Sequence, residues 1–128
     1  MTSTKQLCFS TKDIKLVPFS VKSGPGTHYN LKMRELIKRD RHIFEKTELV
    51  IMNFQPGGYT VPHSHPGREQ AYYVLRGKAS VKVGNEQCIV KKSDVVLIPR
   101  NTLHSYKVIG KELFKFLIID VELVKPSK

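Results

Sequence analysis

Two histidines separated by one residue, His63 and His65, are the most distinctive candidates for chemistry in this 128-residue sequence. In an extended strand, side chains at positions i and i+2 point to the same side and lie about 7 Å apart at the backbone. The two imidazoles can therefore converge on one metal ion. Because imidazoles serve many other roles and such pairs arise by chance, the pair needs further ligands nearby before it predicts a metal site.

Further ligand candidates follow a short turn. Pro66-Gly67 is expected to turn the chain so that the next strand runs back beside the first. Glu69 and Gln70 begin that strand and must face opposite sides of it, so only one of them can join the histidines. His104 lies much farther along the chain, where a neighbouring strand of a small barrel can bring it alongside.

The elements that must hold these residues are short strands. From about residue 48 onward, runs of strand-forming residues alternate with turn signals. We expect QPGG (55–58) to end the first strand and Gly84-Asn85 to form a tight hairpin turn. DVVLIP (94–99) is a continuous apolar run, typical of a strand buried on both faces. The pattern predicts an all-β sandwich or barrel built from ELVIMNF, QAYYVLRG, ASVKV, EQCIV, DVVLIP, HSYKVI and LFKFLIIDV.

Residues 1–47 give a weaker pattern. KLVPFS (15–20) and YNLKMRELI (29–37) are predicted as strands, although the second also permits a helix through Met33, Leu36 and Ile37. We expect one domain, in which residues 1–47 supply N-terminal strands and loops that cover the barrel edge. Residues 48–124 then form the barrel core.

The chain is basic, with a net charge of +11 from 22 Lys and Arg against 11 Asp and Glu. These basic residues are spread along the sequence, and the one dense segment, LKMRELIKRDRH, contains no recognisable nucleic-acid-binding motif. We therefore expect no nucleic-acid partner. The charge favours instead an anionic small-molecule substrate, attracted by electrostatic steering.

The sequence also predicts a cytoplasmic protein without a membrane partner. No apolar run approaches the roughly 20 residues that a membrane span needs, and the N-terminus lacks the apolar core of a secretory signal. Cys8 and Cys88 are the two cysteines, and their spacing fits no metal motif. A reducing compartment is expected, with one long-range disulfide left open as an alternative.

Two stretches resemble the two signatures of the cupin superfamily. GGYTVPHSHPGREQAYYVLRG (57–77) resembles the first and DVVLIPRNTLH (94–104) the second, and the matching positions are Gly57, His63, His65, Gly77, Pro99 and His104. Asn101 stands where the second signature usually has glycine, and asparagine is the next-best residue for positive φ. The resemblance implies a single-domain, RmlC-like jelly roll, a small antiparallel β-barrel with one divalent metal ion inside.

The resemblance also selects the fourth ligand. In the first signature six residues stand between the glutamate and the final glycine, and leaving out six residues before Gly77 leads to Gln70. Glu69 fits the shorter forward spacing, and it remains the alternative if a bulge turns it inward. The implied metal ligands are thus His63, His65, Gln70 and His104.

Glutamine in place of glutamate does not exclude metal binding. Some cupins with glutamine here resemble a pectin-breakdown enzyme that linearises unsaturated uronic sugars. Since an amide adds only a dipole, the site keeps a larger positive charge and a stronger attraction for anions. Zn, Fe, Mn, Ni and Cu all fit this ligand set.

Two tyrosines are candidate catalytic residues. Tyr72 shares the face of Gln70 by the two-residue period of a strand, and Tyr106 follows His104 by two residues. A phenol at the pocket wall can act as an acid or hydrogen-bond donor. Packing in the core is the alternative for each.

Three functions fit the resemblance. The first is an enzyme of the isomerase or lyase type that acts by acid–base chemistry on a small anionic, oxygen-rich substrate such as a sugar acid; the glutamine and the basic charge favour it. The second is a metal-dependent dioxygenase of the cupin type. The third is a non-catalytic barrel that binds or senses a small ligand. Cupins of this size commonly pair, and the apolar YYVL and LFKFLIID runs agree with a homodimer.

Overall fold

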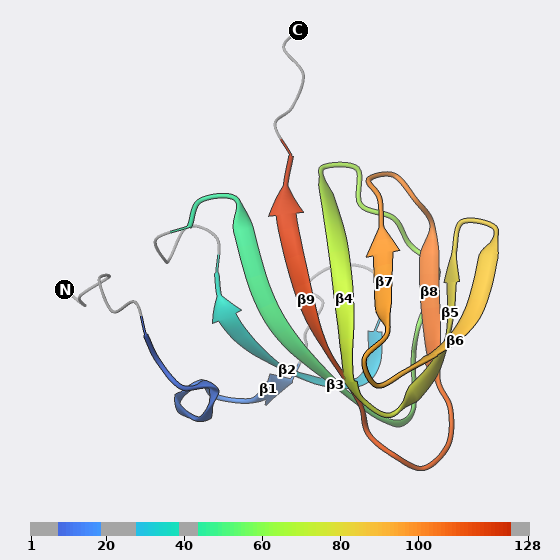
Figure 1. Ribbon diagram of the computed structural model, residues 1–128, viewed down its shortest axis with the longest axis horizontal. Helices are drawn as coiled ribbons and strands as arrows, with labels where there is room; N and C mark the ends of the chain where they lie inside the picture. Colours follow the sequence, from blue (N-terminus) through green and yellow to red (C-terminus); the bar gives the residue numbers. More distant parts are fainter. Residues whose placement is uncertain (1–7, 19–27, 39–43, 124–128) are drawn as a thin grey trace, which may run out of the picture.

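The structure, a computed structural model, describes residues 8–18, 28–38 and 44–123. Short strands make up most of this part of the chain (Figure 1). In chain order the elements are the 3₁₀ turn η1 (Thr11–Asp13), β1 (Val17–Pro18), β2 (His28–Ile37), β3 (Thr47–Thr60), β4 (Arg68–Arg76), β5 (Lys78–Val83), β6 (Glu86–Lys91), β7 (Val95–Ile98), β8 (His104–Val108) and β9 (Phe114–Glu122).

The strands form one antiparallel sheet that curls into a barrel. Within the described residues the sheet follows the path β6-β5-β8-β3-β9-β4-β7, and β2 pairs with β1 and β3. The last strand, β9, lies between β3 and β4, as Figure 1 shows. The expectation that the strand after Pro66-Gly67 runs beside the preceding one is therefore wrong, because β9 occupies the place next to β3. The prediction of an all-β antiparallel barrel is confirmed.

The inward faces of the strands form an aromatic and aliphatic core. Alternate residues of β9, from Phe114 to Asp120, are buried, as the two-residue period of a strand requires. The Phe54 ring meets the Tyr106 ring edge-to-face at a centroid distance of 5.1 Å and stacks on Phe116 at 6.0 Å. Burial of these large rings stabilises the barrel wall from which the site residues project.

The strands predicted in residues 1–47 are confirmed in part. YNLKMRELI lies within the strand β2, so the helical alternative is wrong, and Val17–Pro18 of KLVPFS form β1. Residues 19–20 of KLVPFS lie outside the described residues. The assignment of residues 1–47 as a cover for the barrel edge stays a prediction, although β2 does pair along β3.

The QPGG segment does not end the first strand as expected. β3 continues through it to Thr60, but the segment changes the strand's partner. Up to Phe54, β3 pairs with β9, and from Tyr59 it pairs with β8. Gly57 has a φ of +83°, which glycine adopts without strain, and the register with β2 shifts at the same place. The turn signal thus marks a bulge at which one long strand bends between two neighbours.

Of the remaining local predictions, two are confirmed and one is wrong. The Gly84-Asn85 hairpin is confirmed between β5 and β6, and Asn101 has the positive φ, 65°, that its place in the motif requires. DVVLIP is wrong as a strand buried on both faces, because Val95 and Leu97 of β7 face outward and are exposed. The described residues therefore leave the outer face of β7 uncovered, and its inner face alone, with Val96 and Ile98, is buried.

Two further observations concern the predicted setting. Cys8 and Cys88 are both free and exposed, so the long-range disulfide left open by the sequence is not formed. Among the described residues, none of the helical structure has the length and hydropathy that would let it cross a membrane. The cytoplasmic location stays a prediction.

Candidate metal centre

His63 and His65 lie on the irregular connection between β3 and β4. Within this connection, the structure gives His63 an isolated antiparallel bridge to His104. Pro62 and Pro66 flank the pair, and because proline has no N–H to donate, a regular ladder cannot run through the segment. The prediction that a continuous strand presents the two histidines is wrong, although their imidazoles do come together.

Backbone hydrogen bonds join this connection to the start of β8. The His63 amide donates to the His104 carbonyl at 3.0 Å, and the His104 amide donates back to His63 at 2.9 Å. The Asn101 amide donates to the His65 carbonyl at 3.1 Å. The two motif segments, far apart in sequence, are therefore fixed to each other by three backbone contacts around the histidines.

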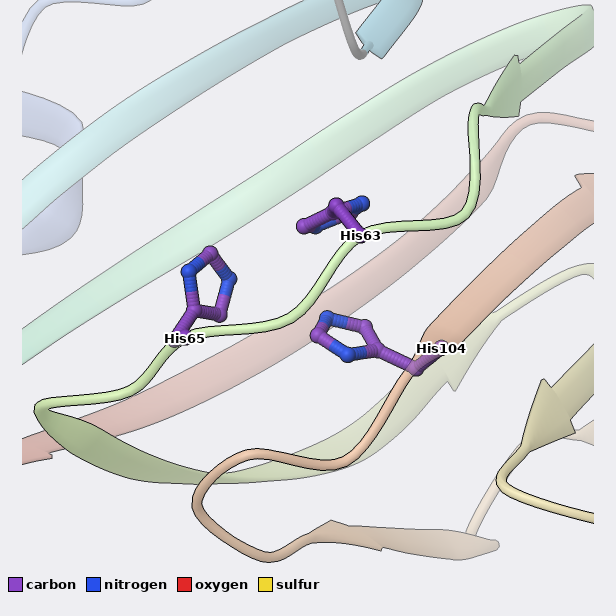
Figure 2. A group of neighbouring side chains, drawn as sticks. All are labelled: His63, His65 and His104. Carbon is purple, nitrogen blue, oxygen red and sulfur yellow. The ribbon is translucent and has the colours of Figure 1, made fainter.

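The three imidazoles form one cluster (Figure 2). Their ring centroids lie 5.0 Å apart for His63 and His65, 4.3 Å for His63 and His104, and 5.2 Å for His65 and His104. One ring nitrogen of each lies within 4.8 Å of those of the other two. Two nitrogens bound to an ion at about 2.1 Å are at most about 4.2 Å apart, so modest ring rotations suffice to bind one ion.

Hydrogen bonds prepare two of the rings as metal ligands. The Nδ1 of His63 lies 2.7 Å from the Val61 carbonyl, and that of His104 lies 3.0 Å from the Thr102 carbonyl. A carbonyl can only accept, so each Nδ1 carries the proton and each Nε2 keeps a lone pair. The His104 Nε2 is buried and meets no hydrogen-bond partner in the described part of the chain. An orphaned lone pair between two other imidazoles suits a metal ion, and fixing the tautomer through Nδ1 is what metal-binding histidines require.

The environment also keeps the imidazoles of His65 and His104 neutral. Burial, followed by the nearby Arg68 guanidinium, lowers the pKa of His65 to about 4. Burial likewise lowers the pKa of His104, although its hydrogen bond to Thr102 acts in the opposite sense. Since a metal binds the unprotonated ring, both side chains are in the binding form at neutral pH.

Gln70 and Glu69 face opposite sides of β4, and Gln70 faces inward. Glu69 is exposed, whereas the Gln70 amide Nε2 donates to the buried Asp120 carboxylate at 2.7 Å. The Gln70 Oε1 accepts a hydrogen bond from the Tyr72 hydroxyl at 3.3 Å. Because a carboxylate can only accept, Asp120 fixes which end of the amide is which. One lone pair of Oε1 stays available, and the role of Gln70 as a ligand stays a prediction.

Tyr72 and Tyr106 are core residues whose hydroxyl groups lie in the barrel interior. Both are 3% exposed, and their rings meet edge-to-face at 5.8 Å. Burial raises the pKa of each phenol above its ordinary value of 10, so both stay protonated at neutral pH. Within the described residues the Tyr106 hydroxyl has no hydrogen-bond partner. Both phenols can therefore donate but not act as bases, and their catalytic role stays a prediction.

Sequence reasoning missed Arg68 and Asp120. Arg68 Nη2 lies 3.1 Å from His65 Nδ1, and Arg68 Nη1 lies 3.5 Å from Asp120 Oδ2. Asp120 is 4% exposed and lies opposite Gln70 in the β4–β9 register. The alternation of β9 could have revealed Asp120. Phe114, Phe116 and Ile118 occupy every second position, and Asp120 is the next residue on the same inward face.

Known proteins resemble both the sequence and the fold. Residues 50–120 match the family description "Cupin domain". The chain belongs to the cupin family. An uncharacterized protein of Methanocaldococcus jannaschii is 31% identical over 103 residues, which cover 80% of this cupin and 78% of that protein. Quercetin 2,3-dioxygenase of Bacillus subtilis is 25% identical over 105 residues, covering 80% of this cupin but only 31% of the enzyme.

Solved structures confirm the jelly-roll barrel. A predicted oxalate decarboxylase from Thermotoga maritima superposes with a TM-score of 0.79 at 21% identity, covering 91% of this cupin and 100% of that chain. KdgF from a Halomonas species gives a TM-score of 0.71 at 15% identity, covering 89% of this cupin and 94% of that chain. At these identities the likeness establishes the fold alone.

Proposed function

We propose that this cupin is a metal-dependent enzyme that isomerises, or eliminates from, a small anionic, oxygen-rich substrate such as a sugar acid. His63, His65 and His104 would hold one divalent ion, and Gln70 would add an amide oxygen. Such an ion acts as a Lewis acid that polarises an oxygen of the bound substrate. The choice among Zn, Fe, Mn, Ni and Cu remains open because this ligand set suits them all.

One observation carries the metal-binding part of this proposal. The Nε2 of His104 is buried without a partner among the described residues, between two further imidazoles. A buried polar atom without a hydrogen bond costs about 1–3 kcal/mol, and a metal ion would remove that cost. The overall charge of +11 supports an anionic substrate through electrostatic steering.

The chain's own groups support acid–base chemistry at this place. Tyr72 and Tyr106 keep their protons at neutral pH, so a hydroxyl in contact with substrate would donate a hydrogen bond. The aromatic core around these phenols excludes water, which strengthens such hydrogen bonds. This combination favours phenols that stabilise negative charge on a substrate oxygen by hydrogen bonding over phenols that act as bases.

Metal binding by ligand variants tests the proposal. His63→Ala and His104→Ala each remove one imidazole, and we expect metal affinity to fall by more than the 10–100-fold typical of losing a residue that only supports a ligand. Titration with Co(II), followed by its visible spectrum, measures the affinity, and circular dichroism checks the fold. Cys88→Ala is the control, because its exposed thiol lies on β6, and it should bind Co(II) normally.

The fourth ligand is tested by a pair of neighbouring substitutions. Gln70→Ala is expected to weaken Co(II) binding by about 10-fold, whereas Glu69→Ala on the exposed face should leave it unchanged. The reverse result would assign the fourth position to Glu69. Full retention of Co(II) binding by the His63→Ala and His104→Ala proteins would contradict the proposed metal centre.

A dioxygenase is the second candidate, favoured by the similarity to quercetin 2,3-dioxygenase across 80% of this chain. One screen of the metal-loaded protein distinguishes the two activities. Isomerisation or elimination of sugar acids, followed by proton NMR without oxygen uptake, supports the first. Oxygen uptake with flavonols or other enols on an oxygen electrode supports the second. Tight binding of a ligand without turnover would support the non-catalytic barrel.

A further inference from the structure

Arg68 is the one cation that the structure shows in direct contact with the histidine cluster among the described residues. It follows the histidine pair at the first position of β4. It lies on the inward face, in the alternating series that continues with Gln70 and Tyr72. A charged group on the inward face of a barrel strand is costly unless it is paired, so its presence there calls for a reason.

The partners of Arg68 use only part of its capacity. Its Nη1 faces the Asp120 carboxylate at 3.5 Å and its Nη2 donates to His65 Nδ1 at 3.1 Å. A guanidinium carries five N–H donors in a planar fork that matches a carboxylate. The Arg68 side chain is 36% exposed, whereas that of Asp120 is 5% exposed. The buried carboxylate therefore holds the Nη1 side of the fork, and the arginine side chain stays partly exposed to solvent.

The contact between Arg68 and His65 is incompatible with metal binding at His65. A guanidinium only donates, so the contact needs a lone pair on His65 Nδ1. If a metal takes Nδ1, that lone pair is used, and if it takes Nε2, the neutral ring carries its proton on Nδ1. With either nitrogen as ligand, Arg68 loses its acceptor while Asp120 still holds it beside the cluster.

We infer that Arg68 is a substrate-binding residue that pairs with a carboxylate of the substrate once the metal occupies the histidine cluster. This inference rests on the proposed metal-dependent function and narrows its substrate to a small acid. One substrate oxygen would lie at the metal and a carboxylate at Arg68, as a 2-hydroxy acid or a sugar acid allows. Asp120 is the positioning residue, since it accepts a hydrogen bond from Gln70 and forms an ion pair with Arg68.

Charge counting agrees with this substrate class. With neutral imidazoles and a neutral Gln70 amide, the charges of Arg68 and Asp120 cancel, and a divalent ion leaves the cluster with two positive charges. A carboxylate together with an ionisable hydroxyl offsets that charge, and a neutral ligand does not. Bidentate hydrogen bonds between arginine and carboxylate are also charge-assisted, which makes them stronger than hydrogen bonds between neutral groups.

A single variant separates this role from a merely structural one, because the two roles predict opposite signs. In Arg68→Gln the competitor for the His65 lone pair is gone, so Co(II) affinity without any acid should equal or exceed that of the wild type. Glycolate affinity of the Co(II)-loaded protein should fall by about 10- to 100-fold, the worth of hydrogen bonds to a charged group. Glycolamide, the neutral counterpart of glycolate, should bind both proteins alike. The Co(II) visible spectrum reports metal and acid binding separately.

Arg76→Gln is the matched control. Arg76 ends the same strand and pairs with Glu112 at 2.9 Å, so its loss removes the same charge away from the cluster. It should change glycolate affinity by less than about 2-fold, as expected for an exposed charge that is screened by salt. Arg68→Lys keeps the charge without the fork and should bind glycolate with intermediate affinity.

The outcomes distinguish the two levels of the proposal. Unchanged glycolate affinity in Arg68→Gln, or an equal loss in Arg76→Gln, would overturn the role of Arg68 and leave the metal centre standing. Loss of Co(II) binding in Arg68→Gln and Arg68→Lys alike would make Arg68 a structural residue and also overturn it. Failure of the wild type to bind Co(II) would instead contradict the metal-dependent function itself.

Discussion

The residue at position 70 is best understood through its partner on the neighbouring strand. Gln70 lies opposite Asp120 in the β4–β9 register, and its amide donates to that carboxylate at 2.7 Å. A glutamate at position 70 would bring a second carboxylate to the same place, and two like charges across a strand pair repel. The amide is therefore the side chain that Asp120 accommodates. This pairing gives a structural reason why glutamine, and not glutamate, suits position 70.

That pairing predicts the result of a double-mutant cycle. Gln70→Glu should lower the free energy of unfolding of the metal-free protein by about 1–3 kcal/mol, because it replaces a charge-assisted hydrogen bond by a repulsion. Adding Asp120→Asn should restore most of the loss, since an asparagine amide can donate to the new carboxylate. Urea denaturation at neutral pH measures the wild type, the two single variants and the double variant. A loss on Gln70→Glu that is the same in the wild type and in the Asp120→Asn protein would show that residues 70 and 120 do not interact.

At the residue scale, the sequence predicted what is local or carried by a motif. His63 and His65 are one residue apart, and His104 follows from the second signature, so their cluster was predictable. The contact of Arg68 with Asp120 depends on β9 lying next to β4, which no local pattern specifies. Asp120 was readable as an inward-facing charge, but the identity of its partners was not.

Two connections between strands contain a glycine with a positive φ, and the two glycines have different surroundings. Gly77, between β4 and β5, has a φ of +83°, and Gly110, between β8 and β9, has a φ of +85°. A Cβ on Gly77 would overlap the Leu113 carbonyl and lie 2.9 Å from the Phe114 Cα. A Cβ on Gly110 would meet nothing within 4 Å. The two glycines share a positive φ and differ in how closely other atoms approach them.

This difference predicts two unequal losses of stability. Gly110→Ala should cost about 1–2 kcal/mol, the penalty of a left-handed conformation for an L-residue. Gly77→Ala should cost about 1–3 kcal/mol more, because the backbone of β9 must move away from the new methyl group. Thermal or urea unfolding of the metal-free proteins measures both. Equal losses of stability in the two variants would mean that the close contact between Gly77 and Leu113 adds nothing to the cost of Gly77→Ala.

At the element scale, the sequence predicted the strands better than their partners. Composition and turn residues placed the hairpin at Gly84-Asn85 correctly because both strands are adjacent in the chain. The same kind of signal failed at QPGG, where glycine allows a bulge instead of a stop. It failed again after Pro66-Gly67, because the neighbour of β4 is supplied from the far end of the chain. Non-local pairing is the part that local propensity cannot encode.

The molecule as a whole combines a high positive charge with one face that carries little charge. Two cross-strand rows, Leu97–Ala71–Ile119 and Val95–Tyr73–Leu117, run across the outer face of β7, β4 and β9. We call these six residues the outer patch. A shallow pocket of about 370 Å³ lies on it, lined in part by Ala71, Leu97 and Ile119. An exposed contiguous apolar surface of this kind is typical of an interaction site.

The homodimer expected from the sequence stays a prediction, and the outer patch is where we expect it to form. Most homodimers associate about a twofold axis, which brings the same patch of both copies into contact. Copies that each carry a net charge of +11 repel one another, so a patch whose six members are all uncharged is the favourable place for contact. The absence of nucleic-acid and membrane partners likewise stays a prediction.

A single charge introduced into the outer patch tests the dimer. Leu97 is 68% exposed, so Leu97→Lys should leave folding stability within about 0.5 kcal/mol while placing two like charges across the twofold contact. We expect a dimer for the wild type and a monomer for the variant by light scattering after size exclusion. Ile89→Lys is the control, because Ile89 is similarly exposed, at 61%, but lies on β6 at the other end of the sheet path. A monomeric wild type would contradict the prediction outright, and a dimer that dissociates on Ile89→Lys but not on Leu97→Lys would move the interface to the opposite end of the sheet.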